Sequence, residues 1–352
     1  MSTRARGKTD GPIFTITYWG TTGSFPVPLQ PAGILDKVVG AVEHLVRHRQ
    51  LADLQPGPGL RAAVRERVLS CLPFHLRSSF GGNTTCVEVQ TPDALLILDC
   101  GSGARELGLC LEQRWNAPAY QGPRTAHVLL THAHLDHLLG SPFFAPYFDA
   151  RNEFILWGTP KVLDTLASFL KAHYPTMYSK MTAIRGRRPI EAGREFRIGA
   201  THIRTYALNH PGGCLAYRLE NAGRSFVFVT DHEQPEVPDR GLADFARGAD
   251  LLYLEGQFLD QEYAGDVRVP GEGGQPRRGW GHSTISGCVE TAVRAQARCL
   301  HVGHRDPLRR DDELVALERH YQRRMREALR RAGRKANECR FALAGEGMTV
   351  HV

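Results

Sequence analysis

Hydrophobic and polar residues alternate along most of the chain in a pattern typical of β-strands, interrupted by stretches with helical periodicity. Residues 14–20 (FTITYWG) predict a first strand, which runs into a turn rich in Gly and Pro. Further strands are expected at 85–89, 95–99, 127–131, 154–157, near Phe196, at 203–207, 215–219, 226–230, 251–255, before His304 and at 348–352. Helices are expected at 163–172, after Ser283, and from Asp311 along the apolar positions Leu314, Leu317, Tyr321, Met325 and Leu329. This order favours a layered α/β protein in which helices cover sheets.

One long helical stretch stands apart from this alternation, between residues 31 and 77. Its first half places four apolar residues on one helix face: Val38, Val42, Leu45 and Val46. The sequence QPGPG at 55–59 then breaks the helix, and a second face resumes with Leu60, Val64 and Val68. We therefore expect an N-terminal helical insertion at 31–77 within a single domain that spans residues 1–352.

Composition restricts the class of protein further. Of 352 residues, 42% are hydrophobic and 23% are charged, which permits a sizeable core and excludes wholesale disorder. The longest apolar runs have strand length, far short of the roughly 18 residues that a membrane helix needs. No secretory signal is visible at the N-terminus, and the eight cysteines form no CxxC pair. These features predict a cytoplasmic protein with reduced thiols and no membrane partner.

The net charge of +7 is concentrated in one segment. Between residues 319 and 335 eight basic side chains stand against one acid, Glu327, so the rest of the chain is close to neutral. A solvated helix face explains this segment best, and a patch that binds a polyanion such as RNA is the less favoured interpretation.

The segment 127–140 (HVLLTHAHLDHLLG) carries the clearest chemical signal. An apolar strand ends at Thr131, and His132, His134, Asp136 and His137 follow within six residues. Histidine and carboxylate are the usual ligands of a borderline-soft divalent metal. Because residues two apart in such a turn can point to one side, a single turn can supply ligands to two neighbouring ions.

The sequence HAHLDH resembles the metal-binding signature of the metallo-β-lactamase fold superfamily. His210, Asp231 and His304 follow later strands in the order of that family. Within the superfamily, the motifs that resemble the ribonuclease Z-like and cyclic-nucleotide phosphodiesterase-like branch are FGGNTTCVEV, LDCGSG, NHPGG, GHST, GHRDP and GEGMTV. The resemblance covers roughly residues 14–30 and 78–352. It implies an α/β fold, a four-layer αββα sandwich with the helical insertion added near its N-terminus.

The resemblance also implies two divalent metal ions, with zinc favoured and manganese the alternative. His132, His134 and His210 would hold one ion, Asp136, His137 and His304 the other, and Asp231 would bridge them. His301 is a rival for the last position, but the Asp-Pro pair that follows selects His304. His232, next to the bridging Asp231, is expected to point away from the ions, and Asp99 to orient ligands through hydrogen bonds.

Two ions about 3.5–4 Å apart can share a hydroxide and clamp both oxygens of an in-line displacement, which suits a phosphodiester. We assign catalytic roles to Asp136 and to His282, which lies in WGHST. Ser283 and Thr284 can cap the helix that follows, and a phosphate at its N-terminus would find free N–H groups. His282 would then protonate the leaving oxygen or anchor the phosphate.

The leading interpretation is a dinuclear metal-dependent phosphodiesterase for a small nucleotide, cyclic nucleotides included. The alternatives are a tRNA 3′-processing endonuclease, a lactonase, thioesterase or β-lactamase, and a non-catalytic ligand sensor. The tRNA enzyme usually carries a long basic arm, for which the stretch between His137 and His210 has no spare length. The insertion at 31–77 and a Gly/Pro/Arg-rich loop at 266–278 depart from the family pattern. Both are candidates to cap the site, and the insertion is equally a candidate homodimer contact.

Overall fold

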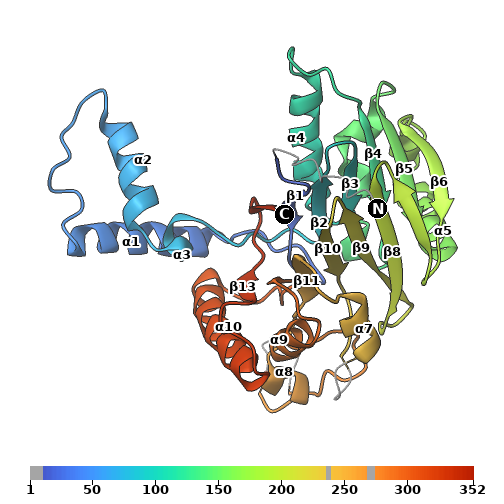
Figure 1. The fold of residues 1–352 in the computed structure, drawn as a ribbon. Coiled ribbons are helices and arrows are strands. Elements are labelled where there is room, and N and C mark those ends of the chain that lie inside the picture. The colour runs from blue at the N-terminus through green and yellow to red at the C-terminus, as the bar shows by residue number, and fades with distance from the viewer. Residues whose placement is uncertain (1–10, 235–238, 268–273) are drawn as a thin grey trace, which may run out of the picture.

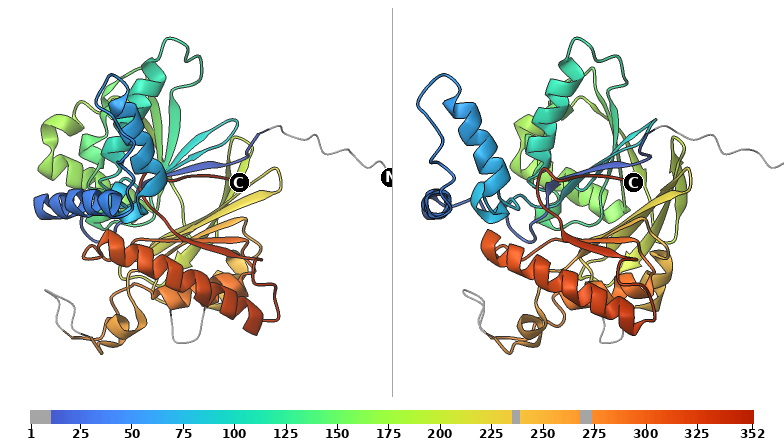
Figure 2. Two further views of the ribbon diagram at one scale, coloured as in Figure 1. Left: turned by 90° about the vertical axis from the view of Figure 1, so that its left-hand side faces the viewer. Right: turned by 60° about the vertical axis from the view of Figure 1, so that its left-hand side comes forward.

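Two β-sheets lie face to face and helices cover their outer sides in the computed structural model, which describes residues 11–234, 239–267 and 274–352 (Figure 1). Each sheet has seven strands in the described residues. Figure 2 shows α10 (Asp311–Arg331), in red, outside one sheet and the green helices outside the other. The four-layer αββα sandwich expected from the sequence is confirmed.

The first sheet is built around the N-terminal strands. Its spatial order is β14 (Thr349–His351), β1 (Thr15–Gly20), β2 (Cys86–Gln90), β3 (Leu95–Leu98), β4 (Thr125–Leu129), β5 (Glu153–Gly158) and β6 (Ile184–Pro189). Strands β3 to β6 run parallel to one another, whereas the neighbouring pairs β14–β1, β1–β2 and β2–β3 are antiparallel. Its outer side is covered by α4 (Ala104–Asn116) and α5 (Pro160–His173), with α6 (Pro175–Tyr178) following α5.

The second sheet contains the strands that lead to the later candidate ligands. Its spatial order is β13 (Arg340–Leu343), β12 (Cys299–Gly303), β11 (Leu251–Glu255), β10 (Arg224–Val229), β9 (Cys214–Asn221), β8 (Thr201–Leu208) and β7 (Glu195–Ile198). Its helices are α7 (Arg240–Phe245), α8 (Asp260–Ala264), α9 (Ile285–Arg294) and α10 (Asp311–Arg331). Burial of Leu314, Tyr321, Met325 and Leu329 confirms the apolar stripe expected along α10.

The core between the sheets is mainly apolar, and it also contains several tyrosines and the buried His301. Ile16, Val87 and Leu98 of the first sheet pack against Tyr217 and Phe228 of the second. Separate clusters fill the space between each sheet and its helices. Because this packing fixes both sheets, the loops at their shared edge are held at a defined separation.

Several elements of the structure were not expected from the sequence. Strand β6 reads IRGRRP, and most of its side chains are exposed because it is an edge strand held by backbone hydrogen bonds to β5. Helix α4 was also not expected, although its buried residues Leu107, Leu111 and Trp115 recur at helical spacing directly after the glycine turn 101–103. Strand β13 was not expected because it is only four residues long.

The insertion at 31–77 forms an arm that projects from the sandwich (Figure 1). It consists of α1 (Pro31–Arg47), α2 (Leu60–Cys71) and the single turn α3 (Phe74–Arg77). The expected break between the two helices is confirmed. The residues expected on one apolar face of α1, however, differ in their burial. Leu45 is buried, whereas Val38, Val42 and Val46 are exposed.

No helix among the described residues is both long and apolar enough to cross a membrane. Residues 268–273 of the loop 266–278 lie outside the described residues.

Candidate metal centre

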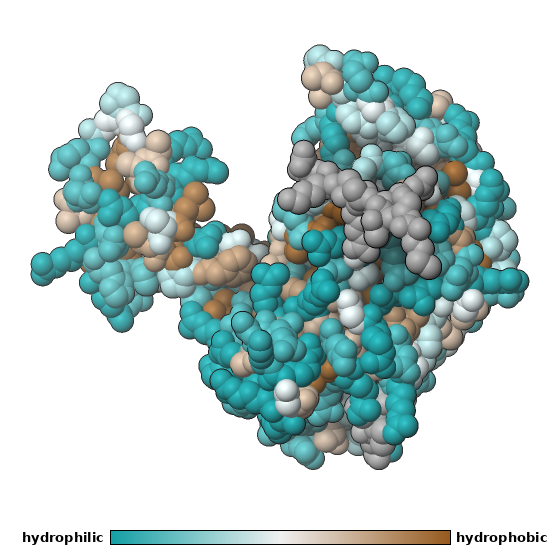
Figure 3. All heavy atoms as spheres, viewed as in Figure 1, coloured by the Kyte–Doolittle hydropathy of each residue, from teal (hydrophilic) through white to brown (hydrophobic). Residues whose placement is uncertain are grey.

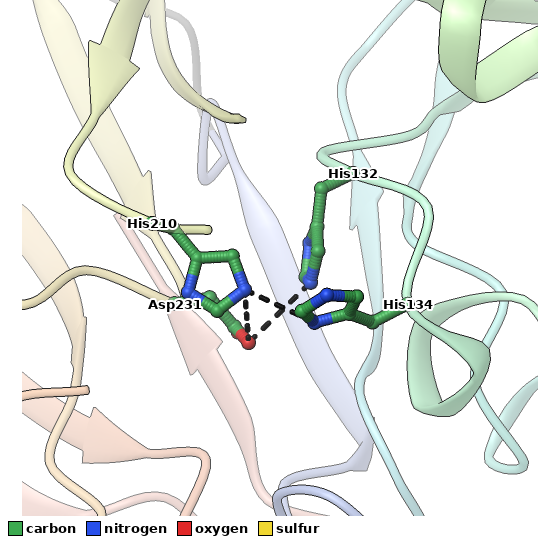
Figure 4. Close-up of side chains that lie close together, drawn as sticks. All are labelled: His132, His134, His210 and Asp231. Carbon is green, nitrogen blue, oxygen red and sulfur yellow. Dashed lines mark hydrogen bonds and ion pairs between the residues drawn. The ribbon is translucent and has the colours of Figure 1, made fainter. Parts of the chain in front are cut away.

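Two histidines of the loop after β4 lie opposite a histidine and an aspartate from the second sheet (Figure 4). His132 and His134 follow β4, His210 follows β8, and Asp231 follows β10. The ligand atoms of these four residues all lie within 4.8 Å of one another. His210 Nε2 is 3.0 Å from His134 Nδ1, and His132 Nε2 is 3.4 Å from Asp231 Oδ2.

A second group lies directly beside the first and contains Asp136, His137 and His304. The Nε2 atoms of His137 and His304 are 3.3 Å apart. Asp136 Oδ2 is 3.3 Å from the first of these nitrogens and 3.2 Å from the second. His304 follows β12 of the second sheet, so this group also joins both sheets.

Asp231 faces both groups with different oxygens. Its Oδ2 is 3.4 Å from His132 Nε2 and 3.7 Å from His210 Nε2, in the first group. Its Oδ1 is 3.2 Å from the Nε2 atoms of both His137 and His304, in the second group. A carboxylate placed in this way suits a bridge between two ions.

These residues fit two divalent ions. Ligand atoms about 3.4 Å apart are what tetrahedral coordination at 2.0–2.1 Å requires, and the separations above are 3.0–3.7 Å. His132 Nε2 is buried and has no hydrogen-bond partner among the described residues, although it is aimed at the cluster. A buried polar atom of this kind is costly unless a ligand satisfies it.

Neighbouring groups fix the orientation of the ligand rings. Asp99 Oδ2 lies 2.8 Å from His137 Nδ1, and both Asp99 oxygens accept hydrogen bonds from Thr131. His210 Nδ1 donates to the carbonyl of Gly281 at 2.9 Å. A side chain at residue 281 would collide with the ring of His210, so the close approach requires glycine there. Such contacts select the tautomer that leaves the other nitrogen free to bind metal.

The backbone is unusual at three of these positions. Asp99, Asp231 and His304 have φ of +60°, +22° and +48°, a region that residues other than glycine rarely adopt. Residues in this region concentrate at functional sites, where the surrounding structure holds them.

Close contact between acids and imidazoles shifts the pKa values strongly. Burial acts to raise the pKa of Asp231, but the rings of His304 and His137 outweigh it and hold that pKa well below its usual range. Burial acts to lower the pKa of His137, but the surrounding carboxylates outweigh it, Asp231 most strongly, and raise that pKa well above its usual value. The carboxylates are therefore ionised at neutral pH, as metal ligands must be.

His282 lies at the edge of the cluster, and its ring stacks on that of His304 with centroids 5.2 Å apart. Its Nδ1 is 4.0 Å from Asp231 Oδ2 and 3.8 Å from Glu255 Oε2. Burial lowers the pKa of His282 to about 3, so its ring is neutral at physiological pH. Asp231, His282 and His304 also form a group close enough to share an ion, so a ligand role for His282 needs a direct test.

Glu255 is the residue of this site that the sequence reasoning missed. It is buried at the end of β11, and burial, together with Asp231, raises the pKa of its carboxyl well above the usual value. The backbone N–H groups of Ser283 and Gln257 donate to it. The available signal was an acid at the carboxyl end of a fully apolar strand, LLYLE.

Known proteins are similar to the part of this chain that carries the ligand residues. The family model described as "Beta-lactamase superfamily domain" matches residues 95–304, from β3 to the histidine after β12. The chain belongs to the beta-lactamase superfamily. This match confirms the family expected from HAHLDH.

The curated relatives that this superfamily member matches include two named ribonuclease Z. That of Thermoplasma acidophilum is 21% identical over 52% of this chain and 57% of its own length. That of Bradyrhizobium sp. (strain ORS 278) is 25% identical over 70% of this chain and 89% of its own length. The chain spans little more than half the length of the first of these relatives.

Among solved structures, zinc-bound PqqB from Methylobacterium extorquens has the same fold. It superposes with a TM-score of 0.61 and 15% sequence identity, and the match covers 96% of this chain and 100% of PqqB. At this identity the likeness concerns the fold alone.

Two neighbouring histidines lie apart from the ligand groups of this superfamily member. His301 is buried between the sheets, where its Nδ1 is 2.9 Å from the Tyr18 hydroxyl. His232 accepts a hydrogen bond from the backbone N–H of Asn209 through Nδ1. The geometry therefore places His304 in the cluster, and His232 supports the loop that carries His210.

One detail expected of the GHST motif is wrong. Thr284 caps α9 as expected, because its hydroxyl accepts from the Gly287 N–H. Three of the N–H groups at this helix start are not free, however: those of Ser283, Ile285 and Gly287 are bonded to Glu255, Phe258 and Thr284. The helix N-terminus therefore offers little to a phosphate, and His282 is the group of this motif that lies at the cluster.

Proposed function

We propose that this beta-lactamase superfamily member is a dinuclear metal-dependent phosphodiesterase whose substrate is a small nucleotide, cyclic nucleotides included. The observation that carries the proposal is the pair formed by Glu255 and His282 beside the ligand cluster. Membership of the superfamily and the two ligand groups support a metal-dependent hydrolase in general. The pair adds a means of delivering a proton to a poor leaving group.

In this proposal His132, His134 and His210 hold one ion, and Asp136, His137 and His304 hold the other. Asp231 bridges them. Two bound divalent ions, which we expect to be zinc, would supply a water-derived nucleophile at neutral pH and neutralise charge on the phosphoryl oxygens. Asp136 also accepts a 2.9 Å hydrogen bond from the Ser24 N–H, so it ties the loop after β1 to the second group.

Glu255 and His282 would act together on the leaving oxygen. Because burial raises the pKa of Glu255 and lowers that of His282, a proton shared by the pair resides on the carboxyl and not on the ring. His282 Nε2–H would donate to the leaving alkoxide while Nδ1 takes the Glu255 proton, which returns the ring to a neutral tautomer. The 3.8 Å separation must shorten in this step, as catalytic hydrogen bonds commonly do when substrate binds.

The residues around the rim of the cluster favour a nucleotide over a phosphodiester that has no nucleobase. Three large apolar side chains close to ligands in sequence are exposed: Phe25 after Ser24, Leu135 between His134 and Asp136, and Trp280 before Gly281. The ring of Trp280 is also covered on one side by the Arg277 guanidinium, 4.4 Å from the ring centroid. A nucleobase gains from stacking on such a ring regardless of sequence.

A small substrate agrees with the packing of residues 138–209. Helix α5 and strands β5 to β8 account for most of this stretch, and they belong to the sandwich. The second candidate, an RNA-processing endonuclease, is favoured by the curated relatives named ribonuclease Z. We also propose that the two ions are zinc and that the protein acts in the cytoplasm.

A substrate panel tests the proposal and separates its rivals. The metal-loaded protein should hydrolyse bis(p-nitrophenyl) phosphate faster than nitrocefin or an acyl-homoserine lactone, and a panel of cyclic nucleotides should contain its best substrate. Faster turnover of an uncharged substrate would contradict the phosphodiesterase assignment. Cleavage of a precursor tRNA at its 3′ side, with no cyclic nucleotide hydrolysed, would support the endonuclease instead.

A further inference from the structure

Helix α1 presents an apolar face to solvent. Six aliphatic side chains on it are each 50–62% exposed: Ile34, Leu35, Val38, Val39, Val42 and Val46. We call them the α1 stripe. Their spacing places them along one side of the helix over its whole length. Figure 3 shows the arm projecting from the sandwich, with hydrophobic residues interspersed among hydrophilic ones on the face in view.

The arm has almost no core of its own. Leu45 and Leu72 are its buried apolar residues, at 6% and 5% exposure, and α2 contributes none. Helices as short as α1 and α2 are marginal in water unless an apolar face is covered. A further surface packed on the α1 stripe would provide that burial.

Contacts with the sandwich hold α1 so that the stripe faces outward. Lys37 Nζ is 2.7 Å from Asp311 Oδ2 and donates to the Ser78 carbonyl at 2.8 Å. On the same side, Gly40 lies close to the side chain of Leu76. The stripe is therefore not a surface that the arm can bury by lying against its own sandwich without breaking these contacts.

The sequence of the stripe points to a second copy of this chain. Residues 34 and 46, and residues 38 and 42, lie at equal distances on either side of residue 40. Two copies of α1 packed antiparallel around a two-fold axis would therefore place Ile34 against Val46 of the partner subunit and Val38 against Val42 of the partner subunit. Arg47, on the edge of the stripe, would then lie near Asp36 of the partner subunit at both ends.

Other occupants fit less well. A membrane surface favours aromatic residues and a basic polar face, but α1 has no aromatic ring besides that of His44, and its polar edge mixes Asp36, Glu43 and Arg47. We propose that the α1 stripe is the interface of a two-fold symmetric homodimer, formed by antiparallel packing of two projecting arms. Self-complementary two-fold contacts are the commonest arrangement in homo-oligomers.

The size of the stripe sets the expected strength. A helix of 17 residues is about 26 Å long and about 10 Å wide, which is small beside the roughly 800 Å² per partner of a standard interface. We therefore expect a dimer with a micromolar dissociation constant.

Sedimentation velocity of the full-length protein across a concentration series tests this inference. The wild type should shift from monomer to dimer in the micromolar range. Val38→Glu/Val42→Glu should raise the dissociation constant at least about 100-fold, because it places four carboxylates in an apolar seam. Val38→Ser/Val42→Ser should weaken the dimer less, and Arg323→Glu on the exposed side of α10 is the matched control that should leave it unchanged.

Far-UV circular dichroism should show that every variant folds, since every changed residue is exposed, and any loss of helix in the dissociated variants should not exceed the contribution of α1 and α2. A wild type that stays monomeric up to about 100 μM would overturn the inference, because even weak specific dimers are populated there. A dimer that survives both stripe variants would also overturn it.

Cross-linking tests the antiparallel register. The double variant Val38→Cys/Val42→Cys should form covalent dimers with a short thiol cross-linker, above the background of the wild type with its partly exposed Cys71 and Cys110. Ile34→Cys alone should not, because antiparallel packing about residue 40 holds the two copies of this position about 18 Å apart. Efficient linkage at position 34 would indicate parallel helices and contradict the proposed arrangement.

Discussion

The metal centre and the projecting arm place polar and apolar residues in opposite ways. At the centre, ionisable side chains such as Asp99, His137 and Asp231 are almost completely buried, between the two sheets. On the arm, aliphatic side chains are exposed along α1. Buried charge and exposed apolar surface are both unfavourable in an isolated chain. We therefore propose that each region is completed by a different component, metal ions in the first case and a second subunit in the second.

The regions also differ in how firmly the rest of the molecule holds them. Each of the rings of His132, His137 and His210 has a hydrogen bond that fixes its second nitrogen. The arm is fixed mainly at its base, through Lys37 and the neighbouring turn α3. We expect changes at the centre to abolish chemistry, and changes on the α1 stripe to alter assembly without affecting the chemistry.

The largest effect is expected from Asp231→Ala. Because the two oxygens of this side chain face different ligand groups, its loss should lower occupancy of both metal sites and reduce hydrolysis below detection. Metal content after gel filtration and turnover of bis(p-nitrophenyl) phosphate measure the two effects. The control Asp244→Ala removes an exposed acid of α7 and should retain both ions. Loss of a single ion from Asp231→Ala would show that this residue does not bridge.

His282→Ala should keep both ions but lose about 10²–10⁴ in kcat, the usual contribution of a positioned acid. The loss should be smaller for esters with good leaving groups, because p-nitrophenolate needs little protonation. Glu255→Gln should reproduce the leaving-group dependence with a smaller loss, since it acts through the ring. A loss of metal from His282→Ala would identify His282 as a ligand instead, and unchanged activity would remove the main support for a phosphodiester substrate.

Trp280→Ala should raise KM for a nucleotide substrate about 10- to 100-fold, as loss of one base–aromatic stack does. Turnover of bis(p-nitrophenyl) phosphate by the same variant should change by less than about threefold. Trp19→Phe, at a partly buried tryptophan whose indole N–H bonds to Glu88, is the control distant from the rim. Equal losses on both substrates would mean that Trp280 supports the loop of Gly281 and does not contact a base.

Substitution of the α1 stripe tests whether the arm affects the chemistry of the metal centre. Val38→Glu/Val42→Glu should retain two ions per chain and the same kcat within about twofold, although it dissociates the dimer. Metal content and steady-state kinetics of the monomeric variant measure this. A large fall in kcat would show that the arm takes part in forming the active site, and the two regions would then not be independent.

The smallest expected effect concerns stability in acid. Burial lowers the pKa of His301 from 6.5 to about 4. Between these values the unfolded chain binds the proton that the folded chain refuses, so this residue destabilises the fold as pH falls through that range. The difference amounts to about 2 kcal/mol at pH 5 and vanishes above pH 7. Urea unfolding of His301→Gln should therefore show a weaker pH dependence than the wild type, and the exposed control His320→Gln should not.

How much of the molecule the sequence could predict depended on the physical origin of each element. Strand β11 and helix α10 were predicted because burial imposes a continuous apolar run on the first and a hydrophobic period on the second. The edge strand β6 was not, since its stability comes from backbone hydrogen bonds that leave the side chains unconstrained. The exposure of Val38, Val42 and Val46 was also beyond reach, because a helical period indicates one apolar face but not what covers it.

The candidate site shows the same division. The residues gathered in HAHLDH, and the later His210, Asp231 and His304, were found through short motifs, and the structure brings all of them together. Glu255 has no such motif, and only its position at the end of a strand next to the cluster reveals it. The bonded N–H groups at the start of α9 depend on contacts with distant residues, which no local pattern encodes.

The number of metal ions that the metal-free protein takes up decides whether its centre is dinuclear. The chelated, dialysed chain should be titrated with zinc, and the bound metal should be measured by elemental analysis after removal of free ions. We expect two ions to bind per chain, and phosphodiester hydrolysis to recover as the second site fills. Binding of no ion or of one ion, with full activity at that point, would contradict a dinuclear centre.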